Sequence, residues 1–181
     1  MNIATGVRPG ETVLVTAAAG RIGSVLAQLA AAAGARVVAA VGGPAKRAAT
    51  GADVDYLAPG WAGALPPVDV ALDAVGGAVG AEALRATRAG GRFGIYGFTS
   101  GEYVALDARD VNRRGLTVVG AMGLAVRRPV ARQRAAVRRA LTAGLVPRVH
   151  AVHPLEAAAA AHEDLEQRRN IGAVLLSLDA G

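Results

Sequence analysis

Apolar and polar residues alternate in blocks along the chain, and six of the apolar blocks have the length and composition of short buried strands. Most of them are rich in valine, leucine or alanine, and glycine, proline or charged residues lie at or near their ends. The predicted strands are Thr12–Val15, Arg36–Val41, 54–57, 68–75, 92–96 and 116–119. Helical periodicity follows the first of them and recurs at 78–88. Strands that alternate with helices in this way specify an α/β fold with a doubly wound parallel sheet.

The first predicted strand leads into a turn of small residues and then into an amphipathic helix. Apolar side chains recur through this helix at three- and four-residue steps, at Ile22, Val25, Leu26, Leu29, Ala30 and Ala33. Gly34 is expected to end it, because glycine is favoured in the left-handed position after a helix C-terminus. A strand, a small-residue turn and a helix form the first half of a dinucleotide-binding unit.

The turn between this strand and this helix has the composition that a pyrophosphate requires. Phosphate groups bind free N–H groups at a helix N-terminus, and a Cβ atom at the closest approach would hold the phosphate away. The usual spacing is G-x-G-x-x-G, and here the chain reads AAGRIG from Ala18. Ala18 replaces the first glycine, whereas Gly20 remains for phosphate approach and Gly23 for packing of the helix on the strand. The alternative is an ordinary strand–helix turn in a chain rich in glycine and alanine.

The end of the second strand predicts which nicotinamide cofactor binds. An NAD site places Asp or Glu about 20 residues after the glycine motif, where the carboxylate accepts from the ribose 2′-hydroxyl. Here the strand ends in Gly42, Gly43 and Pro44, followed by Lys46, the only lysine of the sequence, and by Arg47. Small residues with a nearby cation accept a 2′-phosphate, so NADP(H) is favoured over NAD(H). The alternative is that both cations are solvated at the start of a helix.

The pattern of elements changes beyond Gly120. Helices are predicted over 129–143 and 154–167, and extended segments over 146–152 and 172–178. The predicted domains are therefore a dinucleotide-binding Rossmann core, residues 1–121, and a helix-strand-helix-strand extension, residues 122–181. Ligands of a doubly wound sheet bind beyond the carboxyl ends of its strands. The loops at Val75 and at Gly97 and Phe98 are therefore expected to face the same crevice as Gly20.

Composition narrows the class of protein further. Hydrophobic residues make up 52% of the 181 residues and aromatic residues only 3%, which suits a core of small aliphatic side chains. The net charge is +6, but the densest basic cluster is typical of a solvated helix side, so no nucleic-acid partner is predicted. That cluster comprises Arg127, Arg128, Arg132, Arg134, Arg138 and Arg139. No run is apolar enough to span a membrane and no signal peptide opens the chain, so a cytoplasmic protein without a membrane partner is expected.

Other catalytic and metal constellations find little support. The short-chain dehydrogenase motif Tyr-x-x-x-Lys is absent, although the spacing of the turn is similar to that of the family. The sequence has no cysteine, and its histidines, at 150, 153 and 162, lack a carboxylate pattern that would complete a site, so no metal is predicted. Asp73, near a strand end, is expected to hydrogen-bond a neighbouring loop. No residue has the pattern of a catalytic acid or base.

Six segments match, in order, the cofactor-binding half of a known superfamily. They are RPGETVLVT from Arg8, AAAGRIGS from Ala17, GAD from Gly51, VDVALDAVGG from Val68, GGRFGIYG from Gly90 and HPLEAAAAAH from His153. Together they resemble the medium-chain dehydrogenase/reductase superfamily, most closely its zinc-independent, quinone-oxidoreductase-like branch. The resemblance implies hydride transfer between NADPH and a small-molecule substrate, namely a quinone, an enone or a carbonyl compound.

The resemblance also implies roles for single residues. Contacts to the pyrophosphate would come from the turn residues Gly20, Arg21, Ile22 and Gly23. Contacts to the 2′-phosphate would come from Gly42, Lys46 and Tyr56. The nicotinamide and its ribose would lie against Val75, Gly97 and Phe98. In this superfamily the sixth strand, which here begins at Leu116 and ends at Gly120, often pairs across the axis of a homodimer.

The chain departs from the superfamily in one large respect. Members begin with a separate catalytic domain, and this chain starts where that domain would end. The terminal strands, which in the superfamily return to that domain, are expected to be covered by a second copy of the chain or by a local pairing. The alternative functions are a non-catalytic NADP(H)-binding or sensing module and a dimerising fold with a vestigial site.

Overall fold

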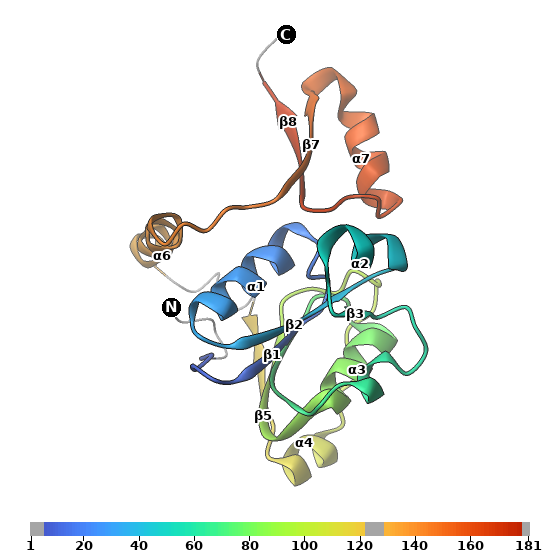
Figure 1. Ribbon diagram of the computed structural model, residues 1–181, viewed down its shortest axis with the longest axis vertical. Helices are drawn as coiled ribbons and strands as arrows, with labels where there is room; N and C mark the ends of the chain where they lie inside the picture. The colour runs from blue at the N-terminus through green and yellow to red at the C-terminus, as the bar shows by residue number, and fades with distance from the viewer. Residues whose placement is uncertain (1–5, 122–128, 179–181) are drawn as a thin grey trace.

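The computed structural model describes residues 6–121 and 129–178, and its centre is a parallel sheet of six strands (Figure 1). The strands lie in the order β3-β2-β1-β4-β5-β6, and every neighbouring pair is parallel. Their bounds are β1 Thr12–Val15, β2 Arg36–Val41, β3 Val54–Asp55, β4 Val68–Asp73, β5 Thr87–Ile95 and β6 Thr117–Gly120. The chain builds one half of the sheet outward from β1 and the other outward from β4, so the predicted doubly wound sheet is confirmed.

Successive residues of the central strands point to opposite faces of the sheet and build two cores. The elements between the strands are α1 Arg21–Ala32, α2 Pro44–Thr50, the 3-10 helix η1 Trp61–Ala64, α3 Gly77–Ala86 and α4 Ala108–Arg114. On one face Val13, Val15 and Leu72 pack in the cluster that includes Ala30 of α1. On the other face Leu14 and Phe93 pack in the cluster that includes Ala83 of α3. Both faces are thus buried, as expected for a parallel sheet.

Two elements differ most from the prediction made from sequence, and the strands predicted over 54–57 and 68–75 end earlier, at Asp55 and Asp73. The polar segment before β6, for which no helix was predicted, forms α4, because the carboxylate of Asp107 caps the helix by accepting from the Arg109 amide at 2.8 Å. β5 begins at Thr87, whose extended backbone pairs with Val68 before the ladder is interrupted and resumes at Arg92. Helix α3 is correspondingly shorter than predicted.

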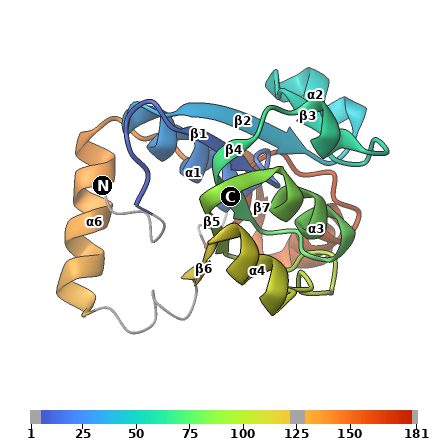
Figure 2. The same cartoon turned by 90° about the horizontal axis from the view of Figure 1, so that it is seen from below.

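The C-terminal part of the chain forms a separate unit. It consists of α6 Val130–Thr142, β7 Val149–Pro154, the 3-10 helix η2 Leu155–Ala157, α7 Ala158–Glu166 and β8 Ala173–Ser177. β7 and β8 pair in parallel as a second, two-stranded sheet, which is the local pairing that was one of the two predicted alternatives. α6 has no buried residue, and its described arginines are exposed as predicted, whereas Arg127 and Arg128 lie outside the described residues. Figure 2 shows α6 standing to one side of the main sheet.

Within the described residues, hydrogen bonds join the C-terminal unit to the core at three places. The amide group of Gln28 in α1 bonds both backbone groups of Val146, at 3.0 and 3.1 Å. The backbone N–H of Gly172 donates to the carbonyl oxygen of Ala19 at 2.7 Å, and the guanidinium of Arg168 donates to the carbonyl oxygen of Thr99 at 2.8 Å. The segment between α7 and β8 therefore lies against the carboxyl edge of the main sheet, on the side of the predicted crevice.

β6 is an edge strand of the main sheet. Its exposed edge is available for the predicted pairing across a dimer axis, and that pairing stays a prediction. No helix within the described ranges has the length and the apolar character that crossing a bilayer requires.

Candidate functional site

A cavity of about 380 Å³ opens where the sequence predicted the ligand crevice, at the carboxyl ends of the parallel strands. Its walls come from the residues that follow β1, β3, β4 and β5 and from the end of β2. Eight of the ten predicted site residues line it, namely Gly20, Arg21, Ile22, Gly23, Gly42, Lys46, Tyr56 and Gly97. The fold thus brings together groups that lie far apart in the sequence.

The N-terminus of α1 faces this cavity with free backbone amides. Gly20 is the residue that precedes the first helical turn, and within the described residues no side chain caps this helix end. A Cβ atom on Gly23 would lie 2.2 Å from the carbonyl oxygen of Ala17, so only glycine lets the helix sit this close to the turn. The first-turn amides and the positive end of the helix dipole together form a cradle for an anion.

The left-handed residue of the turn is Ala17, one position before the alanine that stands in the first glycine position of the motif. Its φ is +50°, a conformation that costs an alanine free energy and a glycine almost none. The carbonyl oxygen of Ala17 accepts from the Gly20 amide at 2.9 Å, which closes the turn. The sequence motif therefore locates the turn, and the residue in the left-handed conformation lies just before the motif.

Asp73, fully buried at the end of β4, ties this turn to the next loop, as predicted. Its carboxylate accepts from the Thr16 hydroxyl at 2.7 Å and from the backbone amides of Val75 at 3.1 Å and Gly76 at 2.9 Å. Three donors compensate the burial of the carboxylate. The Thr16 hydroxyl in turn accepts from the Ala74 amide at 3.0 Å, so the loops after β1 and β4 are held together.

The cavity is positively charged. Arg21, Lys46 and Arg168 line it, and no carboxylate does so in the part of the chain that the structure describes. Burial and, secondarily, the neighbouring charge of Arg168 lower the pKa of Lys46. Two cations held close together in a partly desolvated cavity favour an anionic ligand.

The end of β2 is shaped by Tyr56. A Cβ atom on Gly42 would lie 2.7 Å from the Tyr56 hydroxyl oxygen, so glycine is needed at 42 to admit this ring. Burial is the main cause that raises the pKa of Tyr56. Asp55 is nearby, but its carboxylate accepts from the amides of Gly43 at 2.8 Å and Leu57 at 2.9 Å and does not line the cavity.

Two predicted site residues do not line the cavity. Val75 lies in the loop after β4 with its side chain buried, and its backbone amide donates to the carboxylate of Asp73. Phe98 turns outward and stacks on Tyr103, with their ring centroids 4.4 Å apart. Their predicted contacts with the nicotinamide stay predictions.

Several lining residues were not predicted as site residues from the sequence, among them Tyr96, Leu165, Arg168 and Asn170. Leu165 lies in α7, and Arg168 and Asn170 lie between α7 and β8, in the part of the chain that was predicted to be a C-terminal extension. Nothing in their local pattern points to the turn at residues 17–23, because only the tertiary fold brings the two together. Tyr96 could have been predicted, since it directly follows a strand whose carboxyl end faces the crevice.

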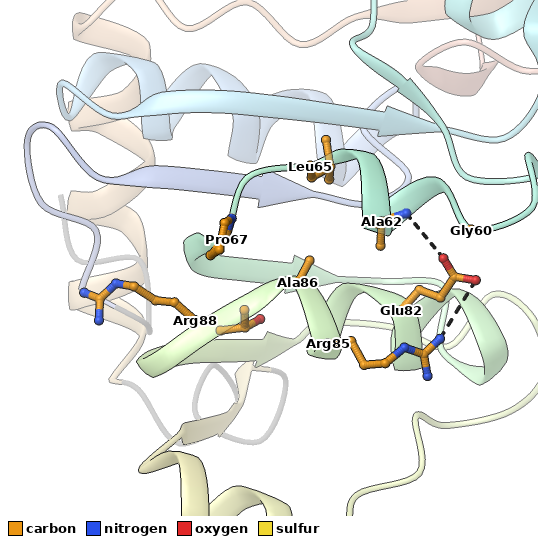
Figure 3. A pocket seen from close by; sticks show the side chains of 10 residues that line it. Gly60, Ala62, Leu65, Pro67, Glu82, Arg85, Ala86 and Arg88 are labelled. Atoms are coloured by element: carbon orange, nitrogen blue, oxygen red, sulfur yellow. Dashed lines mark hydrogen bonds and ion pairs between the residues drawn. The ribbon is translucent and has the colours of Figure 1, made fainter.

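A second cavity, of about 490 Å³, lies at the opposite edge of the sheet, between η1 and α3 (Figure 3). Glu82 lines this cavity, and its carboxylate accepts from the Ala62 amide at 3.3 Å and lies 3.9 Å from the guanidinium of Arg85. Arg88 is paired with Asp69 at 2.6 Å. The charged side chains that line the second cavity have partners of opposite charge within the protein, so the second cavity lacks the excess positive charge of the first.

The histidines form no metal site. Nε2 of His153 lies 3.2 Å from a carboxylate oxygen of Asp164, which links β7 to α7. Within the described ranges, no three or more His, Asp or Glu side chains are gathered where they could hold a metal ion.

Comparison with curated proteins and family models gives two matches. Residues 50–176 match the family model described as zinc-binding dehydrogenase. The chain is also 34% identical, over 191 aligned residues, to the Quinone oxidoreductase-like protein 2 of Bos taurus. That match covers 94% of this chain and 54% of the bovine protein, so the chain spans about half the length of this curated relative.

Two solved structures share both the fold and substantial sequence identity. An NAD-dependent alcohol dehydrogenase is 33% identical with a TM-score of 0.78, and the match covers 98% of this chain and 54% of that one. The quinone oxidoreductase of Thermus thermophilus, solved also in complex with NADPH, is 33% identical with a TM-score of 0.77, covering 98% and 61%. Because the family model spans well over half of its residues, the chain belongs to the zinc-binding dehydrogenase family, within the medium-chain dehydrogenase/reductase superfamily that its motifs resemble.

Proposed function

We propose that the chain is the NADP(H)-binding domain of a quinone-oxidoreductase-like enzyme. One observation carries the proposal: the cavity at the N-terminus of α1 is lined, among the described residues, by three cations and by no carboxylate. The chain spans about half the length of its curated relative, so the activity of the whole enzyme is part of the proposal. The Thermus relative, whose structure was solved with NADPH, supports this choice of cofactor.

The residues of the cavity divide between the two phosphate sites of such a ligand. The first-turn amides of Arg21, Ile22 and Gly23 would hold the pyrophosphate, since they are uncapped and lie at the positive end of the helix dipole. Lys46 would bind the 2′-phosphate beside Tyr56, with the charge of Arg168 close enough to lower the pKa of Lys46. NAD(H) lacks this phosphate and would leave the two cations uncompensated.

The reaction proposed is hydride transfer to or from a quinone, an enone or a carbonyl compound. When bound, the nicotinamide supplies or accepts the hydride at its C4, and the protein contributes binding and orientation. The family name implies zinc, but this chain does not fit a zinc site: its sequence has no cysteine, and the described residues hold no cluster of metal-binding side chains. No zinc ligand is therefore assigned to the residues of this chain.

A non-catalytic NADP(H)-binding module is the second candidate. Tyr96 is the tyrosine that follows β5 at the predicted nicotinamide end of the cavity, and its hydroxyl is already committed to the carbonyl oxygen of Thr16 at 2.6 Å. Tyr96 is therefore not a free proton donor beside the nicotinamide.

Titration of the purified chain with NADPH and NADH, followed by cofactor fluorescence, tests the binding proposal. Lys46→Glu should weaken NADPH far more than NADH, because it places a carboxylate where the 2′-phosphate is expected. Arg47→Glu is the matched control: it makes the same change of charge on the next residue, which does not line the cavity. Equal loss of both cofactors in Lys46→Glu, or equal effects of the two variants on NADPH, would remove Lys46 from this role.

Oxidation of NADPH with a panel of quinones and enones separates the two candidates. Turnover by the purified chain supports the enzyme, whereas tight binding without turnover supports the module. Failure of the wild-type chain to bind either nucleotide refutes both.

A further inference from the structure

Tyr96 joins two loops of the cavity by a partly buried hydrogen bond. Its ring lines the cavity, and its hydroxyl donates to the carbonyl oxygen of Thr16 at 2.6 Å. Tyr96 directly follows β5, and Thr16 directly follows β1 and begins the phosphate turn. The bond therefore ties the loop at the predicted nicotinamide end to the loop at the predicted pyrophosphate end.

The other polar groups of Thr16 already have hydrogen-bond partners besides Tyr96. Its backbone amide donates to Leu72 at 3.0 Å, and its hydroxyl is held by Asp73 at 2.7 Å and by the Ala74 amide at 3.0 Å. Thr16 is fully buried, so its carbonyl needs a partner within the protein. The Tyr96 hydroxyl supplies that partner.

The orientation of this carbonyl decides where the turn amides point. The Thr16 carbonyl and the Ala17 amide share one peptide plane, so rotation of the carbonyl also rotates the first bond of the turn. Ala17 is held in a left-handed conformation at φ +50°, and its own carbonyl receives the Gly20 amide at 2.9 Å. A change at Thr16 would therefore propagate through Ala17 to the amides at the start of α1.

We propose that Tyr96 is a positioning residue, which holds the phosphate turn through Thr16 in the geometry that binds the pyrophosphate of a nicotinamide dinucleotide. This inference rests on the proposed function, since it requires that ligand. A phenylalanine would fill the same space, and the hydroxyl adds the bond to Thr16. Burial raises the pKa of Tyr96, so the hydroxyl remains a donor at neutral pH.

The test compares Tyr96→Phe with the wild-type chain on two ligands. NADPH contains the pyrophosphate, whereas adenosine 2′-monophosphate contains only the part expected at Lys46. The dissociation constant for NADPH should rise about three- to tenfold, the equivalent of one lost hydrogen bond, and that for adenosine 2′-monophosphate should change less than about twofold. Tyr103→Phe, which removes a hydroxyl from an exposed tyrosine outside the cavity, should change neither.

A loss of affinity for NADPH but not for adenosine 2′-monophosphate distinguishes a positioning role of Tyr96 from a general structural role. If Tyr96→Phe weakens both ligands equally, or leaves NADPH unchanged, the inference is overturned while the proposed function stands. Thermal unfolding of the unliganded variant, recorded alongside, shows how much of any loss comes from lower stability. If the wild-type chain binds neither ligand, the proposed function fails and the inference falls with it.

Discussion

Replacing Ala17 by glycine should stabilise the protein, although the same replacement destabilises most other positions. Ala17 has a φ of +50°, and a left-handed conformation brings the Cβ of an L-residue too close to the following carbonyl oxygen. Glycine lacks this Cβ and adopts the conformation freely. The turn itself is fixed by the Gly20 amide, which bonds the Ala17 carbonyl at 2.9 Å, so the substitution leaves the fold around it unchanged.

The expected gain is the difference between two opposing contributions. Relief of the left-handed conformation is worth about 1–2 kcal/mol. The greater freedom of glycine in the unfolded chain removes about 0.5–1 kcal/mol of this. The net stabilisation is therefore about 0–1.5 kcal/mol, and its midpoint of about 0.75 kcal/mol raises the melting temperature of a chain of this size by about 1.5–3 °C.

Urea and thermal unfolding, followed by circular dichroism, measure this change against a matched control. Ala31→Gly makes the same substitution at an exposed position inside α1, where the backbone is helical, and should destabilise by about 1 kcal/mol. The two variants should therefore differ by about 1–2.5 kcal/mol in the free energy of unfolding. Equal destabilisation by both would show that Ala17 is not strained, and the account of the turn would then be wrong.

Two further predictions concern packing and acid stability. Gly23→Ala should destabilise the protein by about 1–3 kcal/mol and remove NADPH binding, because the added Cβ would lie 2.2 Å from a backbone oxygen. The control is Gly63→Ala, whose added Cβ has open space around it and should change the unfolding free energy little. The hydrogen bond from the Thr12 amide and, second to it, the one from Arg88 hold the pKa of Asp69 below its usual range. The carboxylate therefore contributes stability at pH values above its unfolded pKa of about 3.9, and this stability is lost as the pH falls through the folded pKa. Asp69→Asn should therefore be less stable than wild type at neutral pH, with a difference in unfolding free energy that shrinks on acidification; a constant difference would refute this.

The sheet could be predicted from sequence because its signals are local. Thr12–Val15 and Arg36–Val41 are short aliphatic runs between breakers, and both form strands with these bounds. α4 was missed because its stability comes from a cap at Asp107 and a glycine end at Gly115 rather than from an apolar stripe. The early start of β5 was missed because the residues before Arg92 have helical periodicity. The pairing of Thr87 with Val68, which makes this segment a strand, is a tertiary contact.

The site could be predicted only as far as the strands themselves place it. Gly20, Gly42 and Gly97 follow three strands whose carboxyl ends meet, so their convergence follows from the topology alone. Arg168 could not be predicted this way, because it reaches the cavity from the C-terminal unit through its bond to Thr99 at 2.8 Å. Its backbone is left-handed at φ +52°, so the tertiary contact fixes a conformation that local sequence disfavours.

The lowered pKa of Lys46 should make the affinity for NADPH depend on pH, whereas the affinity for NADH should not. In the unliganded chain, burial and Arg168 lower the pKa of Lys46, whereas a bound 2′-phosphate would raise it again. The liganded form thus holds the proton more tightly, so NADPH affinity is full below the unliganded pKa and is lost as pH rises through it. The phosphate itself is already a dianion, since its second pKa is about 6.

Titrations over rising pH should therefore show NADPH binding weaken while NADH binding changes little, because a lysine with a lowered pKa loses its charge at a lower pH than an ordinary lysine. Lys46→Arg is the decisive variant, since arginine keeps its charge throughout and should remove the pH dependence without removing the preference for NADPH. If NADPH and NADH weaken in parallel as pH rises, or if Lys46→Arg leaves the slope unchanged, Lys46 does not face the 2′-phosphate. The cation pair would then serve another anion or the packing of the C-terminal segment.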